Sequence, residues 1–117
     1  MEQLTKKMKE HKIDTDGVIA RLGGNEKLYI TICKKFLNDI SYPSVWEAVN
    51  KGDYEQARKH IHTLKGVAVN LGFIYLSSLC NHLLTELEQQ NFNLFNNDLI
   101  SLAQEYDIII SILNENF

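Results

Sequence analysis

The chain has 117 residues, of which 44% are hydrophobic and 23% are charged, and its formal net charge is −3. This composition is typical of an ordinary globular protein, so we expect residues 1–117 to form a single domain, and the scattered Lys and Arg residues favour neither nucleic acid nor a membrane surface as a partner. No apolar run reaches the length of a membrane span and the N-terminus is polar, so we expect no span, no signal peptide and a cytoplasmic location.

The first predicted helix is short and is defined by its ends. Asp14-Thr15-Asp16 offers side-chain oxygens that can cap a helix start, and Gly23-Gly24 favours an end at Leu22. The polar segment before it, which contains His11, gives no signal. We therefore expect one short extra helix near the N-terminus.

A longer helix is predicted from Asn25, which can cap its start, towards Gly52. Its apolar positions recur at helical spacing and comprise Tyr29, Cys33, Phe36 and Ile40, continued by Trp46 and Val49. Pro43 should bend or restart this helix, because the residue before a proline avoids helical geometry. Cys33 and Cys80 both lie in apolar patterns, which are typical of reduced core cysteines rather than of a disulfide.

The most regular pattern lies between residues 53 and 72. Asp53 and Gln56 resemble a capping box, and Gly72 suits a helix C-cap. The apolar positions between them alternate spacings of three and four and comprise Tyr54, Ala57, Ile61, Leu64, Ala68 and Leu71. This pattern predicts a long helix with one buried face.

Two further helices complete the prediction. The first begins at Phe73 and its apolar positions are Leu76, Leu79, Cys80, Leu83 and Leu87; those of the last helix are Phe95, Leu99, Leu102, Tyr106, Ile109 and Leu113. No segment alternates as a strand. Four long amphipathic helices with short connections predict an all-α fold, an antiparallel up-and-down four-helix bundle.

Gly66 is unexpected inside a helix, where glycine costs about 1 kcal/mol relative to alanine. It lies one turn after His62 and beside Lys65, so these three residues share one face. Because Ile61 belongs to the core stripe, His62 lies about 100° away from it and should be reachable from outside. Gly66 would then leave open space beside the imidazole.

The charges around His62 indicate what the ring could bind. Arg58, Lys59 and Lys65 lie within one turn of it. A neutral imidazole is a nucleophile near neutral pH, and a phosphoryl group on it would gain charge-assisted hydrogen bonds from these cations. We therefore predict that His62 carries a phosphoryl group.

Residues 62–66, His-Thr-Leu-Lys-Gly, followed by Ala68 and by Asn-Leu-Gly at 70–72, resemble the central motif of histidine-containing phosphotransfer (HPt) domains. Ile-Asp at 13–14, Arg-Leu-Gly-Gly-Asn at 21–25 and Phe-Leu at 36–37 resemble the beginning of the same family. The resemblance spans roughly residues 13–90, and Leu76, Leu79, Cys80 and Leu83 fit the family's following helix.

The resemblance implies a four-helix bundle that acts as a histidine phosphocarrier in a two-component phosphorelay. His62 would accept a phosphoryl group from an aspartate of a response-regulator receiver domain, supplied by a hybrid sensor histidine kinase, and pass it to another receiver aspartate. Lys65 would help to hold the phosphoryl group, and Gly66 would clear space. The magnesium used in transfer belongs to the receiver, so the resemblance implies no cofactor or metal in this chain.

One position departs from the family pattern. Several members place Gln or Glu 22 residues after the histidine, where it bonds the second ring nitrogen; this chain has Leu84 there, which can neither donate nor accept. The ring could then be oriented by water, by Asn81 or by Thr85, or it could have no specific partner.

The other histidines give weaker signals. His60 points about 200° away from His62, so the two cannot share a metal ion, and we expect a surface or boundary residue. His82 and Glu86 lie four residues apart, but two ligands are too few for a structural zinc site. No ATP-binding motif is present, so we expect a phosphotransfer intermediate and not a kinase.

An alternative function remains open: a non-catalytic helical bundle that binds and regulates a signalling partner without carrying phosphate. Leu84 slightly favours it, whereas the His-Lys-Gly grouping argues against it. In the leading hypothesis, Val69 and the exposed flank of Ala68 supply part of the docking patch. We expect a monomer, although an exposed Tyr42 or Trp46 would mark a contact.

Overall fold

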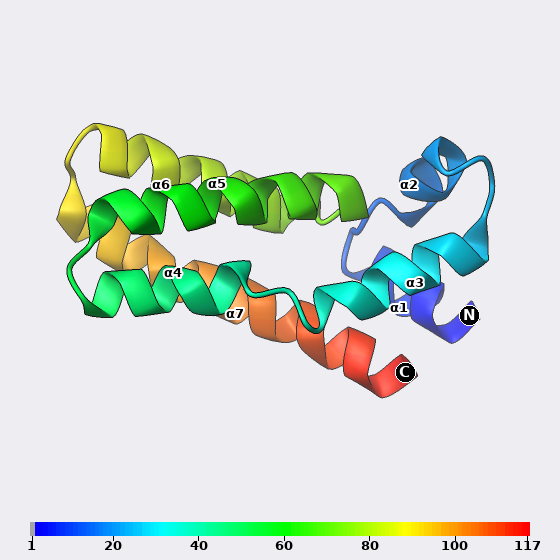
Figure 1. The fold of residues 1–117 in the computed structure, drawn as a ribbon. Coiled ribbons are helices and arrows are strands. Elements are labelled where there is room, and N and C mark those ends of the chain that lie inside the picture. Colours follow the sequence, from blue (N-terminus) through cyan, green and yellow to red (C-terminus); the bar gives the residue numbers. More distant parts are fainter. Residues whose placement is uncertain (1) are drawn as a thin grey trace.

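The computed structural model describes residues 2–117, which form an all-α fold, as predicted, with seven helices and no strand in that range. The helices are α1 (Glu2–Glu10), α2 (Thr15–Arg21), α3 (Glu26–Phe36), α4 (Ser41–Asn50), α5 (Tyr54–Leu71), α6 (Ile74–Glu88) and α7 (Phe92–Asn116). Helices α4, α5, α6 and α7 form an antiparallel bundle, and α1, α2 and α3 gather at one end of it (Figure 1). No helix in the described part of the chain is long and apolar enough to cross a membrane.

Helix α1 was not predicted, and the expectation that its segment carries no signal was wrong. Leu4 and Met8, one turn apart, are buried in the core cluster, and the helix packs chiefly against α7. Just after the helix, His11 places Nε2 2.9 and 3.0 Å from the two carboxylate oxygens of Glu105 on α7. The bundle therefore carries two N-terminal helices, not one.

The expected long helix from Asn25 is divided into α3 and α4. Pro43 lies in the first turn of α4, where a helix does not need its missing N–H. Further inside a helix, the proline ring would clash with the carbonyl group of the preceding turn. The Asp39 carboxylate accepts a hydrogen bond from the Ser41 N–H (2.8 Å) at the break. Ile40 lies in this break and is 75% exposed, so its assignment to the core was wrong.

The α4 side of the core also differs in detail from the prediction. Val45 and Ala48 are buried, whereas Trp46 and Val49 are half-buried. Tyr42 is half-buried rather than exposed, and its ring stacks on Tyr106 of α7 with centroids 3.7 Å apart.

The predicted ends and stripes of the remaining helices are confirmed. The Asp53 carboxylate accepts a hydrogen bond from the Gln56 N–H (3.1 Å) at the start of α5, and Gly72 caps its end in the left-handed conformation. The stripes predicted in α5, α6 and α7 are buried, apart from half-buried Tyr54 and Tyr106. Both cysteines are buried and free, and burial raises the pKa of the Cys33 thiol to about 11.

Two hydrogen bonds attach the N-terminal part of the chain to the C-terminal end of α5. The hydroxyl of buried Tyr29 on α3 donates to the carbonyl of Leu71 (3.2 Å). The Asp14 N–H donates to the carbonyl of Gly72 (3.0 Å). These bonds hold α2 and α3 beside the end of α5.

One acidic pair lies between α6 and α7, with Glu86 buried and Asp98 half-buried. Glu86 is 7% exposed, and one of its carboxyl oxygens is buried without a partner among the described residues. Burial raises the pKa of Glu86 to about 7, helped by the hydrogen bond with Asp98 and by the negative charge of that residue. An unfolded glutamate ionises near its ordinary pKa of about 4.3. Raising the pH from there to about 7 therefore favours the unfolded state.

Glu86→Gln is expected to raise the free energy of unfolding by about 1–2 kcal/mol above pH 7, because the neutral amide removes the cost of burying a carboxylate. The gain should shrink as the pH falls towards 4.5. Urea unfolding at pH 5 and pH 8 measures it, with exposed Glu88→Gln on the same helix as the control. An equal gain at both pH values would contradict the assignment.

Candidate functional site

Helix α5 presents His62 and Gly66 to the outside, with Lys65 half-buried beside them. Their orientation follows from the stripe on the opposite side, because Ile61, Leu64 and Ala68 are completely buried. The histidine therefore faces away from the core, as its distance from the stripe predicts.

The space beside Gly66 is open. A Cβ atom built on this glycine would meet no side chain, and no other part of the fold, within 4 Å. Neither core packing nor the imidazole of His62 therefore requires a glycine here. The missing side chain leaves free surface on the outside of the helix, which only an incoming molecule could use.

Of the positively charged residues around His62, one is held in an ion pair and two are not. The Arg58 guanidinium is bonded to the Glu55 carboxylate, with Nη2–Oε1 at 2.6 Å and Nε–Oε2 at 3.4 Å. Lys59 and Lys65 form no ion pair with the described residues. Two cations within one turn of the ring are thus free to attract an anion.

Lys65 is half-buried on α5, and its charge acts on a residue of α6. Burial raises the pKa of the Cys80 thiol on α6 to about 12, and the nearby charge of Lys65 acts in the opposite direction. The positive charge of Lys65 is therefore felt at α6 as well as at the surface around His62.

No side chain among residues 4–117 makes a hydrogen bond to the imidazole of His62. Leu84 is half-buried on α6 and offers neither donor nor acceptor. The Thr85 hydroxyl donates to the carbonyl of Asn81 (3.1 Å), so its proton is already used. The ring is thus not fixed by a protein group, and its two nitrogens can meet a ligand.

The remaining histidines lie in other surroundings. His60 is half-buried and lines a polar hollow between α4 and α5 together with Glu47 and Lys51. His82 is exposed on α6, whereas Glu86 is buried, and no group of three metal-ligating side chains occurs among the described residues.

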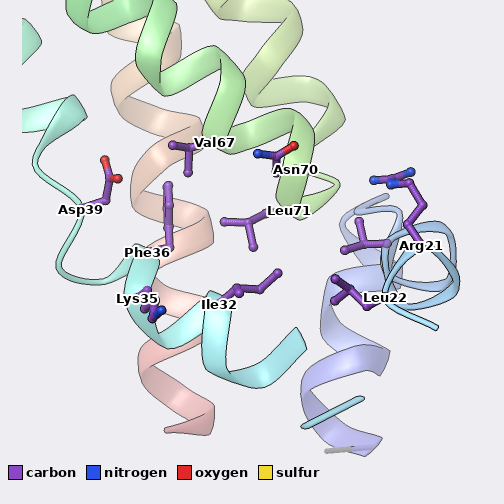
Figure 2. Close-up of a pocket in the computed structure, with 10 residues that line it drawn as sticks. Arg21, Leu22, Ile32, Lys35, Phe36, Asp39, Val67, Asn70 and Leu71 are labelled. Carbon is purple, nitrogen blue, oxygen red and sulfur yellow. The ribbon is translucent and has the colours of Figure 1, made fainter. Parts of the chain in front are cut away.

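An apolar pocket of about 480 Å³ lies between α2, α3 and α5. Val18, Leu22, Ile32, Phe36, Val67 and Leu71 form its walls, and Figure 2 shows Arg21 and Asn70 at its edge. Asn70 lies about 12 Å along α5 from His62, so the pocket is close to the exposed histidine. Sequence patterns missed it because its walls come from three separate helices.

The surface between His62 and this pocket differs from the predicted one. Val69 is 51% exposed, as required of a docking residue, but Ala68 is completely buried and has no exposed flank. Val69 and Asn70 also line a second hollow with Arg21. Ala68 belongs to the core stripe, so the expectation for it was wrong.

A family model described as the Hpt domain matches residues 36–109. The matched range holds His62, Lys65 and Gly66 and extends from the end of α3 into α7. Helices α1 and α2 lie outside it. No curated protein and no solved structure matches the chain significantly.

Proposed function

Because the chain belongs to the Hpt domain family, we propose that His62 carries a phosphoryl group between the aspartates of two receiver domains. Hpt domains are phosphotransfer intermediates of phosphorelay signalling and not kinases. The observation that carries the assignment to His62 is its environment: an exposed imidazole without a protein partner, beside free cations and the open space at Gly66.

The transfer is a displacement at phosphorus. The lone pair of the neutral imidazole, at the outer ring nitrogen Nε2, attacks the phosphorus of the donor's aspartyl phosphate. The N–P bond forms as the P–O bond to the aspartate breaks, and the aspartate leaves as a carboxylate. The ring then releases its Nδ1 proton to water. In the second transfer the ring takes a proton from water at Nδ1, an aspartate oxygen attacks phosphorus, and the electron pair of the N–P bond returns to Nε2, so that neutral imidazole is restored.

Lys65 and Gly66 have separate roles in this proposal. The Lys65 ammonium compensates the charge of the phosphoryl group, which is about −1.5 to −2 near pH 7. Gly66 has no side chain that would obstruct the receiver, so the receiver can bring its aspartate close to the ring. Neither residue exchanges protons with the reacting atoms.

The docking surface would extend from His62 towards the α2–α3–α5 pocket. A standard protein interface buries about 800 Å² on each partner. Such an area centred on His62 includes Val69 and the pocket edge near Asn70. Exposed Val69 and the apolar pocket walls supply the nonpolar contacts, while Arg21 adds positive charge.

A panel of radiolabelled, phosphorylated receiver domains tests the proposal. At least one receiver should transfer its label to this chain, the label should be acid-labile, and peptide mapping at alkaline pH should locate it on His62. Label on another residue, or no label from any receiver including those fused to hybrid histidine kinases, would contradict the proposal.

The unpartnered ring of His62 also suits the alternative function, in which the bundle binds a partner without carrying phosphate. That function predicts that His62→Ala leaves binding to an unphosphorylated receiver unchanged and that no phosphorylated receiver labels the chain. The same panel therefore separates the two functions.

Gly66→Ala is expected to raise the free energy of unfolding by about 0.5–1 kcal/mol, because the added methyl group meets nothing and alanine favours helix. Phosphotransfer should nevertheless slow, and Gly66→Leu should slow it by at least about tenfold, since each group occupies the partner's space. Urea unfolding and single-turnover transfer measure the two effects.

A stability gain combined with slower transfer would distinguish a functional glycine from a structural one. Thr63→Ala, exposed on the same helix, is the control for changes on this surface. Unchanged transfer in Gly66→Leu would contradict the role given to the open space.

The single-domain organisation and the cytoplasmic location also remain proposals. A continuous core from Leu4 to Leu113 supports the first. The second relies on the composition of the chain.

A further inference from the structure

Arg58 lies one helical turn before His62 and on the same face of α5. Side chains on an α-helix lean towards its N-terminus, so the imidazole extends over the turn that carries Arg58. A group attached to the outer ring nitrogen would therefore lie closer to Arg58 than the Cα positions alone suggest. Lys65 leans towards His62 from the other side.

We propose that Arg58 exchanges Glu55 for the phosphoryl group when His62 is phosphorylated, and so forms a clamp around the group together with Lys65. The inference depends on the proposed function of His62. Arg58 would then be a further residue that touches the transferred group. Its ion pair with Glu55 would be its arrangement while His62 is unphosphorylated.

The exchange is favoured by the relative strength of the two contacts. The side chains of Arg58 and Glu55 are 45% and 63% exposed, and exposed ion pairs contribute little because water competes with them. A phosphoryl group carries up to twice the charge of a carboxylate and can accept two parallel hydrogen bonds from a guanidinium. The guanidinium therefore gains by moving to it.

Glu55 has a second partner available after the exchange. Lys59 lies four residues after it, a spacing at which oppositely charged side chains pair on a helix. The pKa of the Glu55 carboxyl is lowered chiefly by Arg58, and also by the charge of Lys59. Glu55 would thus move from Arg58 to Lys59, and no charge would be left without a partner.

The same geometry favours Arg58 over Lys59 as the clamp. Arg58 lies about 40° from His62 around the helix, on the side of Lys65, whereas Lys59 lies about 60° away on the other side. Lys59 also has only a single ammonium group, which cannot bind two phosphoryl oxygens in a fixed fork.

A ³¹P NMR titration of the phosphorylated chain tests the clamp. Phosphoramidate is the phosphoryl donor, so that no receiver contributes contacts, and His62→Gln identifies the signal of His62. Arg58→Gln should raise the pKa of the phosphoryl group by roughly 0.5 unit, because a cation that favours its dianion is lost. Arg58→Lys should restore part of that shift, and Lys59→Gln should change the pKa much less.

Equal shifts in Arg58→Gln and Lys59→Gln would indicate a general effect of surface charge and would overturn the clamp, as would an unchanged pKa in Arg58→Gln. Both outcomes leave the proposed function intact. A wild-type chain with no phosphohistidine signal from His62 would instead overturn the proposed function, and the clamp with it.

Discussion

Replacing His62 with glutamine is expected to abolish phosphorylation of the chain by phosphorylated receivers, with label at least about a hundredfold below the wild-type level. Glutamine has a similar size but lacks the ring nitrogen whose lone pair forms the N–P bond. His62 is exposed, so the substitution should change the free energy of unfolding by no more than about 0.5 kcal/mol. Radiolabel transfer and urea unfolding of the same preparation measure both effects.

Two other histidines are the matched controls. His60→Gln should keep its label, because His60 faces the hollow near Glu47 on the α4 side of the helix. His82→Gln should also keep it, although His82 is exposed like His62, since no Lys-Gly pair follows it. Loss of label in either control, or persistent label in His62→Gln, would assign the phosphoryl group to another site.

Gly72→Ala is expected to lower the free energy of unfolding by about 2–4 kcal/mol. The residue has φ of +79°, where a side chain strains the backbone. An added Cβ would also lie 2.7 Å from the Asp14 carbonyl oxygen and 2.8 Å from Val18 Cγ2. The backbone contact cannot relax by a side-chain rotation, so α2 would have to move away from α5. Urea unfolding measures the loss.

Gly52→Ala isolates the contribution of that contact. Gly52 has φ of +71°, but a Cβ atom there meets nothing within 4 Å. Its substitution should cost only the conformational strain, about 1 kcal/mol. Equal losses of free energy of unfolding in the two variants would mean that the contact of the added Cβ atom with Asp14 and Val18 costs no stability, which would contradict this explanation.

Glycine occurs at positions 72 and 66 for different physical reasons. Gly72 is needed because another part of the backbone lies against it, and the cost of its replacement is a property of the fold. Gly66 has free space in front of it, and the fold loses a little stability by keeping it. A residue retained at a cost to stability is expected where a partner must approach closely.

Sequence patterns predicted α5, α6 and α7 well because each has a stripe that is regular within itself. In α5 the spacing of Ile61, Leu64 and Ala68 determines the buried face without reference to any other helix. The caps at Asp53 and Gly72 are equally local, since their hydrogen bonds join residues a few positions apart.

The error at Ile40 was local, whereas those at α1 and His11 occurred where distant residues decide the outcome. Ile40 continued the periodic pattern of α3, but the helix breaks there because Pro43 must lie in a first turn. Helix α1 looked polar because only Leu4 and Met8 are apolar, and their burial depends on packing against other helices, chiefly α7. His11 gave no signal, since its partner Glu105 lies 94 residues away.

The sequence by itself pointed to His62 for the proposed function and determined which way this histidine faces, because the helical repeat relates His62 to its own core stripe. Only the tertiary structure decided what surrounds that histidine. It joined α2, α3 and α5 into an apolar pocket near the ring and left the imidazole without a protein partner. Periodicity describes one helix at a time, whereas a binding surface is made by side chains that meet only when the helices pack.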